Sequence, residues 1–243
     1  MAPRLDCLGS GHAFSHGRYW SGFLLDGRIL LDCPPQTLAH LYRLDVAPGA
    51  LDLMLLSHAH SDHIGGVDLL LLDVVIAHGE RLADRPLAVA GPPGIYARLR
   101  EVIGDSPRLP AREDSRLRWL EQDSGSAFSW AGVEVECITV EHAPDLVALG
   151  YRVHLDGSTL AYTGDARLTP AIDELAAGAD LLIVECGGER AHGHFEWDDV
   201  RELRARLPAS TRMLVTHYDH ATAPDPALLT GVELAQDLAR YEL

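Results

Sequence analysis

The chain has 243 residues, of which 47% are hydrophobic and 6% aromatic, a composition typical of globular proteins with a full apolar core. Its formal net charge is −16, and all 20 of its basic residues are arginines. The lack of lysine excludes Schiff-base chemistry and a lysine phosphate clamp, and a chain this acidic is expected to repel nucleic acid.

Short apolar runs alternate with helical patterns along the first half of the chain. The pattern predicts strands at residues 4–8, 23–25, 29–32, 52–56 and 87–90, and helices at residues 35–44 and 64–77. A glycine- and proline-rich turn at residues 91–94 opens a third helix that is predicted to continue to Ile103.

The second half of the chain repeats this alternation. Strands are predicted at residues 133–140, 146–153, 159–163, 181–185 and 213–216, and helices at residues 170–177, 198–206 and 226–241. The segments at residues 29–32 and 160–165 are both predicted strands that end at an aspartate, which is a weak internal similarity between the two halves. Meander-like strands mixed with strand–helix units favour β-sheets covered by helices.

The sequence contains no linker or low-complexity segment, so we expect a single domain over residues 1–243. No run approaches the ~20 apolar residues that a membrane span needs, and the first residues lack the features of a signal peptide. We therefore expect a cytoplasmic protein with no membrane partner. The four cysteines lie far apart in apolar runs and are expected to be free and buried.

The densest group of chemically active side chains follows the strand predicted at residues 52–56. Four side chains that can bind a metal fall within six residues there: His58, His60, Asp62 and His63. Imidazole nitrogens and carboxylate oxygens are the usual ligands of zinc and similar divalent cations. The first two histidines can bind one ion, while the aspartate and the third histidine can face a second. Gly65 and Gly66 let the backbone turn tightly beside them.

Three further candidates share a position in the predicted fold. His142, Asp165 and His217 each lie just beyond the carboxyl end of a predicted strand. Ligand sites gather at such strand ends in open α/β sheets. Either histidine alone would more often be structural, but together with the first motif the shared placement predicts a common metal site.

The sequence resembles the metallo-β-lactamase superfamily, specifically its ribonuclease Z-like branch. The likeness extends beyond the segment at residues 57–66, here called the histidine-rich loop. It includes the Leu-Gly-Ser-Gly turn at residues 8–11, the Leu-Asp-Cys strand end at residues 31–33 and the segment at residues 86–94. Residues 179–185 and 215–217 complete the series, which runs from about Leu5 to His217. The resemblance implies an α+β fold, an αββα sandwich of two mixed β-sheets flanked by helices, with its site at one edge.

The resemblance also implies two cations, expected to be Zn²⁺, with Mn²⁺ or Fe as other candidates. The first would be held by His58, His60 and His142, the second by Asp62, His63 and His217, and Asp165 would bridge both. Two ions about 3.5–4 Å apart can share a hydroxide, lower its pKa and stabilise charge on the substrate. The implied reaction is hydrolysis of a phosphodiester or ester-like bond, in which Asp62 also orients the nucleophile.

One more histidine is a candidate catalytic residue. His194 lies just before the helix predicted at residues 198–206, where ribonuclease Z-like proteins carry a general acid for the leaving group. An imidazole with a near-neutral pKa suits that task. The alternative interpretation is that His194 is a loop histidine beside a helix start with no catalytic role. Candidate substrate contacts come from the loop at residues 9–22 and from the chain after His217: they are His12, His16, Arg18, Tyr19 and His220.

The sequence also departs from the family pattern. Ribonuclease Z enzymes that process transfer RNA carry a long glycine- and proline-rich arm before the bridging aspartate, whereas here only residues 143–164 separate His142 from Asp165. Together with the net charge, the short connection favours a small-molecule substrate, such as a phosphodiester, cyclic nucleotide, lactone or thioester, and argues against nucleic acid as a partner. Endonuclease or phosphodiesterase activity on RNA is the alternative.

Two rival classes of function remain open on the same fold. An iron-dependent oxidoreductase is disfavoured because the ligand set is complete for two metals, because the diiron form usually has glutamate at the position of His60, and because a flavin domain is absent. Non-enzymatic metal binding is disfavoured by the presence of Asp62 and His194. The resemblance makes a homodimer plausible, because relatives commonly pair.

Overall fold

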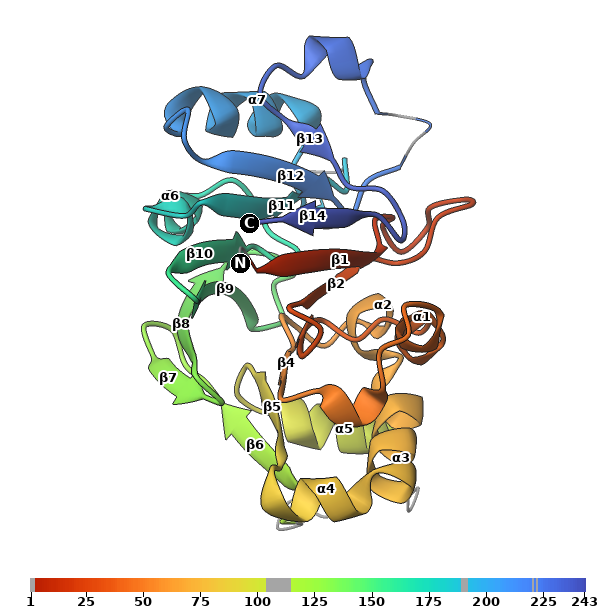
Figure 1. The fold of residues 1–243 in the computed structure, drawn as a ribbon. Coiled ribbons are helices and arrows are strands. Elements are labelled where there is room, and N and C mark those ends of the chain that lie inside the picture. The colour runs from red at the N-terminus through yellow and green to blue at the C-terminus, as the bar shows by residue number, and fades with distance from the viewer. Residues whose placement is uncertain (1–2, 104–114, 189–191, 220, 222) are drawn as a thin grey trace.

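The computed structural model describes residues 3–103, 115–188, 192–219, 221 and 223–243. Within them, two seven-stranded β-sheets pack face to face and helices lie on their outer faces (Figure 1). This arrangement confirms the αββα sandwich that the resemblance implies. In the described ranges, no helix combines the length and apolar character needed to cross a lipid bilayer.

The first sheet contains the amino-terminal strands and the last strand of the chain. These strands are β1 (Arg4–Gly9), β2 (Gly22–Leu25), β3 (Ile29–Leu31), β4 (Leu53–Leu55), β5 (Leu87–Gly91), β6 (Leu117–Glu121) and β14 (Arg240–Glu242). Their order is β14-β1-β2-β3-β4-β5-β6. Pairing is antiparallel from β14 to β3 and parallel from β3 to β6.

The second sheet has the same plan. Its strands are β7 (Ala127–Trp130), β8 (Val133–Val140), β9 (Ala148–Leu155), β10 (Ser158–Tyr162), β11 (Leu181–Glu185), β12 (Arg212–Thr216) and β13 (Glu233–Leu234). Their order is β13-β12-β11-β10-β9-β8-β7, antiparallel from β7 to β10 and parallel from β10 to β13. β3 and β10 therefore occupy equivalent places, each at the change from antiparallel to parallel pairing. They are the two strands whose sequences at residues 29–32 and 160–165 show the weak internal similarity.

Helices cover each sheet on the side away from its partner (Figure 1). Those on the first sheet are α1 (Thr37–Arg43), α2 (Ser61–Ile64), α3 (Val67–Ala77), α4 (Gly79–Asp84) and α5 (Ile95–Ile103), with a 3-10 turn at Pro48–Ala50. Those on the second are α6 (Pro170–Ala176) and α7 (Trp197–Arg206). The predicted helix at residues 64–77 is divided between α2 and α3.

Alternating strand residues fill the layers on either side of each sheet. Ile29 of β3 faces the opposite sheet, whereas Leu30 packs under the helices of the first layer. On β11, Ile183 joins the layer between the sheets and Leu182 packs against the outer helices of the second. Because both faces of these strands are covered, they read in the sequence as unbroken apolar runs.

The helix predicted at residues 226–241 is wrong. This segment forms a 3-10 turn at Pro226–Leu228 and the strands β13 and β14, and Gly231, between the turn and β13, has a φ of +73°. β13 pairs with β12 and β14 pairs with β1, so the segment extends one edge of each sheet. Hydrogen bonds to the unpaired backbone groups at two sheet edges stabilise these strands by more than the helical propensity of the segment would stabilise a helix.

Candidate metal centre

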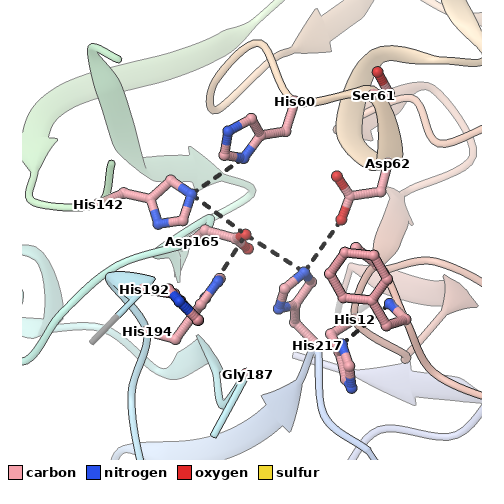
Figure 2. A pocket seen from close by; sticks show the side chains of 12 residues that line it. His12, His60, Ser61, Asp62, His142, Asp165, Gly187, His192, His194 and His217 are labelled. Carbon is pink, nitrogen blue, oxygen red and sulfur yellow. Dashed lines mark hydrogen bonds and ion pairs between the residues drawn. The ribbon is translucent and has the colours of Figure 1, made fainter. Parts of the chain in front are cut away.

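Segments that follow the carboxyl ends of strands supply the candidate metal centre. The histidine-rich loop and α2 follow β4, while His142 follows β8, Asp165 follows β10 and His217 follows β12. Figure 2 shows these three side chains, together with His60 and Asp62, pointing toward one another around a shared centre. The structure therefore brings together all the predicted metal ligands, although they are spread over most of the chain.

The histidine-rich loop sits directly over the end of β3. The backbone N–H of Cys33 donates to the carbonyl oxygen of His63 at 2.7 Å, and the N–H of Gly66 donates to the carbonyl oxygen of Cys33 at 2.8 Å. A Cβ atom at Gly66 would collide with the carbonyl oxygen of Pro34. Glycine at this position thus permits the close approach that places α2 at the site.

Three imidazole nitrogens converge in the first half of the centre. Nδ1 of His60 lies 3.0 Å from Nε2 of His58 and 3.2 Å from Nε2 of His142. Oδ2 of Asp165 lies 3.9 Å from both Nε2 atoms. These four residues form one group whose ligand atoms all lie within 4.8 Å of one another.

The outer nitrogens of two of these rings are fixed by hydrogen bonds. His58 Nδ1 lies 3.0 Å from Ser57 Oγ, whose own proton goes to Asp32, so the hydroxyl oxygen accepts from the ring. His142 Nδ1 donates to the carbonyl oxygen of Gly193 at 3.0 Å. Both rings therefore turn the lone pair of Nε2 toward the centre. His60 Nδ1 lies near both Nε2 atoms but has at most one proton to donate, so at least one lone pair is left that a cation would accept.

The second half of the centre combines two imidazoles with two carboxylates. Nε2 of His63 lies 3.5 Å from Oδ2 of Asp62 and 3.3 Å from Oδ1 of Asp165. Nε2 of His217 lies 3.4 Å from Oδ2 of each aspartate. Asp165 thus contacts both halves of the centre through its two oxygens. His217 has a φ of +52°, a strained conformation for a histidine, of the kind found at functional sites.

Two buried polar atoms at this centre test whether the residues fit metal ions. His63 Nε2 and Asp165 Oδ1 are buried and have no hydrogen-bond partner. An unpaired buried polar atom costs about 1–3 kcal/mol, so natural proteins seldom leave one without a partner. Divalent cations would satisfy both atoms, and the mixed imidazole and carboxylate donors are those that zinc and related ions prefer. The residues present fit the cations that the fold family implies.

The charges of the donors suit metal binding at neutral pH. Burial lowers the pKa of His58, His60 and His142, so that their imidazoles are neutral and able to donate lone pairs. Burial opposes ionisation of Asp165 as well, but His217 and the other neighbouring histidines outweigh it and hold the pKa of this carboxyl well below its usual range. The first half of the centre therefore combines neutral imidazoles with an ionised carboxylate. In the second half, burial opposes protonation of His63, but Asp165 and Asp32 outweigh it and raise the pKa of this imidazole, so a cation there would have to displace a proton.

His194 lies beside this group, on the connection between β11 and α7. Its Nδ1 donates to Oε1 of Glu185 at 3.0 Å and lies 3.9 Å from Oδ2 of Asp165. Burial opposes protonation of His194, but the hydrogen bond and charge of Glu185 outweigh it and raise the pKa of the imidazole to about 9. Glu185 is fully buried and also accepts a backbone N–H from Phe195, so it holds the ring in place.

A pocket of about 370 Å³ opens onto the centre. Its lining includes His194 and, among the candidate substrate contacts, His12. The ring centroid of His12 lies 6.0 Å from that of His217, edge to face. His220 lies outside the described residues.

The other three candidate contacts are not among the described residues that line the pocket. Arg18 forms a 4.0 Å ion pair with Asp237, and the ring of Tyr19 packs edge-on against His40 with a centroid distance of 4.3 Å. His16 is exposed on the surface of the loop. A role for these residues in substrate binding stays a prediction.

Comparisons with known proteins identify the family of the chain. A family model described as a beta-lactamase superfamily domain matches residues 27–218. Ribonuclease Z of Mycobacterium marinum is 32% identical over 88% of this chain and 88% of that protein. The chain belongs to the metallo-β-lactamase superfamily, in its ribonuclease Z-like branch.

Solved structures show the same superfamily fold. The metallo-β-lactamase fold protein YhfI from Bacillus subtilis superposes with a TM-score of 0.77 at 20% identity, covering 100% of both chains. The short form of human tRNase Z superposes with a TM-score of 0.73 at 21% identity, covering 98% of both chains. As a member of this superfamily with ribonuclease Z relatives, the protein is a metal-dependent hydrolase.

The ribonuclease Z relatives contradict one expectation. The sequence argued against nucleic acid as a partner, but relatives that match 88% of the chain are named as ribonucleases. That expectation was wrong because net charge describes the whole surface rather than the pocket. In a metal-centred site, cations rather than lysines can stabilise the charge of a phosphate.

Sequence reasoning missed two residues that support the metallo-β-lactamase centre. Asp32 hydrogen-bonds to Nδ1 of His63, on the side of the ring away from the centre, and Glu185 hydrogen-bonds to Nδ1 of His194. Each follows or ends an apolar strand, and each had a detectable signal, since a buried strand rarely carries a carboxylate without a polar partner. Nothing in the local sequence shows which partner each carboxylate finds.

Proposed function

We propose that this protein is a two-metal phosphodiesterase of the ribonuclease Z kind, which hydrolyses a phosphodiester bond in RNA. The observation that carries the proposal is Asp165, which lies between two groups of buried donors: its Oδ2 is 3.9 Å from Nε2 of His58 and 3.4 Å from Nε2 of His217, and its Oδ1 is 3.3 Å from Nε2 of His63. A carboxylate shared between two donor sets suits a dinuclear centre, and dinuclear centres catalyse in-line displacement at phosphorus. The ribonuclease Z relatives support RNA as the substrate class.

The proposed ligands divide as the resemblance to the ribonuclease Z-like branch implies. His58, His60 and His142 would hold one cation, Asp62, His63 and His217 the other, and Asp165 both. We propose Zn²⁺, because imidazole-rich sets with a few carboxylates suit it, although Mn²⁺ and Fe²⁺ accept the same donors. Bound cations would supply Lewis-acid stabilisation of the phosphate and would lower the pKa of an attacking water.

Two side chains at the pocket have proposed catalytic tasks. The carboxylate of Asp62 points into the centre, where it can orient the attacking water (Figure 2). His194 uses Nδ1 to donate to Glu185, so the proton on its Nε2 is available to the leaving oxygen. The ring of His194 stacks on that of His217 at a centroid distance of 5.3 Å, which places this proton at the edge of the metal centre.

The proposal is tested with metal-loaded protein and two substrates. One is a hairpin RNA with a single-stranded 3′ extension, and the other is bis(p-nitrophenyl) phosphate. We expect cleavage of both, and we expect His63→Ala to lose one metal equivalent by elemental analysis and nearly all turnover. His154→Ala is the matched control, because His154 bonds to Glu136 and Thr159 outside the pocket.

The two substrates separate the parts of the proposal. Hydrolysis of the chromogenic phosphodiester without cleavage of the RNA would leave a phosphodiesterase and remove RNA as its substrate. A fully active His63→Ala variant would contradict the two-metal mechanism.

A further inference from the structure

The turn at residues 12–15 is fixed on the rim of the pocket. The backbone N–H of His12 donates to Ser15 Oγ at 2.9 Å, and the N–H of Ser15 donates back to the carbonyl oxygen of His12 at 3.0 Å. Ser15 Oγ also donates to the carbonyl oxygen of Tyr218, next to His217. Trp20 Nε1 donates to the carbonyl oxygen of Ala13 at 3.1 Å. The turn is therefore anchored to the same segment that carries a metal ligand.

Phe14 projects from this anchored turn into solvent. Its side chain is 83% exposed, yet it is part of the pocket lining. Its ring lies 6.3 Å from that of His12, which lies 6.0 Å from that of His217, so an unbroken row of rings runs from the rim to the centre. Single exposed apolar residues are common, but this one is held at the mouth of a polar site. It offers a flat π-face to whatever enters the pocket.

His12 has a defined tautomer. The backbone N–H of Phe14 lies 3.2 Å from His12 Nδ1, and because an N–H can only donate, this ring nitrogen is the acceptor. The ring proton of the neutral imidazole is therefore on Nε2. This N–H is a donor of the kind that a phosphate oxygen or a sugar hydroxyl accepts.

We infer that Phe14 is a stacking platform for an unpaired nucleobase next to the scissile phosphate, and that His12 donates a hydrogen bond to the same nucleotide. This inference rests on the proposed function and assigns recognition of the nucleotide beside the cleavage point to the turn at residues 12–15. Only an unstacked base can lie against a side chain, since paired bases in a helix keep their faces against their neighbours. Base stacking on aromatic rings is also tolerant of sequence.

The composition of the pocket strengthens the inference. Its described lining contains no arginine, and the sequence has no lysine, so no guanidinium or ammonium group of the lining attracts a phosphate backbone. Stacking on Phe14 supplies RNA affinity that does not depend on charge. A substrate held mainly at one or two nucleotides beside the metal centre is consistent with a pocket of about 370 Å³.

The test places 2-aminopurine, whose fluorescence is quenched by stacking, on either side of the mapped cleavage position of the hairpin RNA. Binding to metal-loaded protein is recorded by stopped flow before turnover. We expect quenching at one of the two positions with the wild type and with Phe14→Trp. We expect the quenching to be lost in Phe14→Ala and in Phe14→Leu, which keeps apolar bulk without a ring. The KM for RNA should rise about tenfold in both of the latter variants.

Ile76→Ala on α3 is the control, because Ile76 is 75% exposed and lies outside the pocket lining. It should leave quenching and KM unchanged. If the wild type cleaves RNA but quenches at neither position, or if Phe14→Leu keeps the wild-type KM, the stacking role is overturned and the proposed function stands. If the wild type cleaves no RNA, both fall together.

Discussion

Oδ2 of Asp32 lies 2.7 Å from Nδ1 of His63, behind the metal centre rather than inside it. The same carboxylate accepts hydrogen bonds from the backbone N–H and hydroxyl of Ser57 and from the hydroxyl of Tyr162. Through Ser57 it also reaches the outer nitrogen of His58. One buried carboxylate therefore orients a candidate metal ligand in each half of the centre, and it fixes His63 with its Nε2 facing the other donors.

Replacing this carboxylate should weaken metal binding more than it weakens the fold. In Asp32→Asn the amide keeps one acceptor but presents N–H groups to donors, so His63 and His58 lose their orientation. We expect metal affinity to fall about 10- to 100-fold, measured by competition with a chromogenic chelator. Asp6→Asn, at a buried carboxylate that pairs with Arg4 and Arg240 far from the pocket, should leave metal affinity unchanged. Equal affinities in the two variants would refute the positioning role.

Glu185 should set the pH range in which His194 can act as an acid. Glu185 outweighs the effect of burial and raises the pKa of His194 to about 9, and a general acid is active only below its pKa. In Glu185→Gln the pKa of His194 should fall toward the ordinary histidine value of 6.5, so the alkaline limb of kcat/KM moves to lower pH. Activity should therefore drop more at pH 8 than at pH 6. An unchanged alkaline limb in a folded variant would assign the acid to another group.

Metal-free protein should be most stable near pH 6.5. Burial lowers the pKa of His58, His60 and His142, so the unfolded chain binds more protons below 6.5 and stability falls as the pH drops through that range. For His63 and His194 the pKa is raised, so their contribution is complete below 6.5 and is lost as the pH rises toward each folded pKa, about 9 for His194.

Thermal unfolding of chelator-treated protein across this pH range measures the effect. Metal-loaded protein should instead gain stability with pH from 6 to 8, because protons compete with cations for the imidazoles. A metal-free Tm that rises steadily from pH 5 to 9 would contradict the assignment of opposed histidine groups.

Gly66→Ala should destabilise the protein through the backbone beneath the histidine-rich loop. A Cβ atom there meets the carbonyl oxygen of Pro34, which belongs to the chain directly after β3 and cannot move freely. We expect a loss of about 2 kcal/mol in the free energy of unfolding. Gly79→Ala is the matched control, since a Cβ at Gly79 meets only the side chain of Arg116 at 3.6 Å and should change stability by less than about 0.5 kcal/mol. Denaturant titration of both variants makes the comparison.

The sequence predicted best those strands that are buried on both faces. β3, β4 and β11 are entirely buried and read as unbroken apolar runs, so their positions were predicted to within one or two residues. β6 and β7 at the far edges of the sheets were not predicted, because alternating or partial burial leaves only a weak pattern in so few residues. β13 and β14 were predicted as a helix, since only the edges with which they pair make them strands.

The sequence by itself indicated metal-binding chemistry, because several imidazoles and carboxylates lie just beyond the ends of apolar strands. Burying such groups without a partner costs free energy, whereas a metal centre requires them. Only the tertiary structure decided which groups support that candidate centre and which line the pocket. It placed Asp32 behind His63, and it set Phe14 at the pocket mouth while Arg18 turned to pair with Asp237. These outcomes depend on hydrogen bonds and packing between residues far apart along the chain, and a local pattern does not contain them.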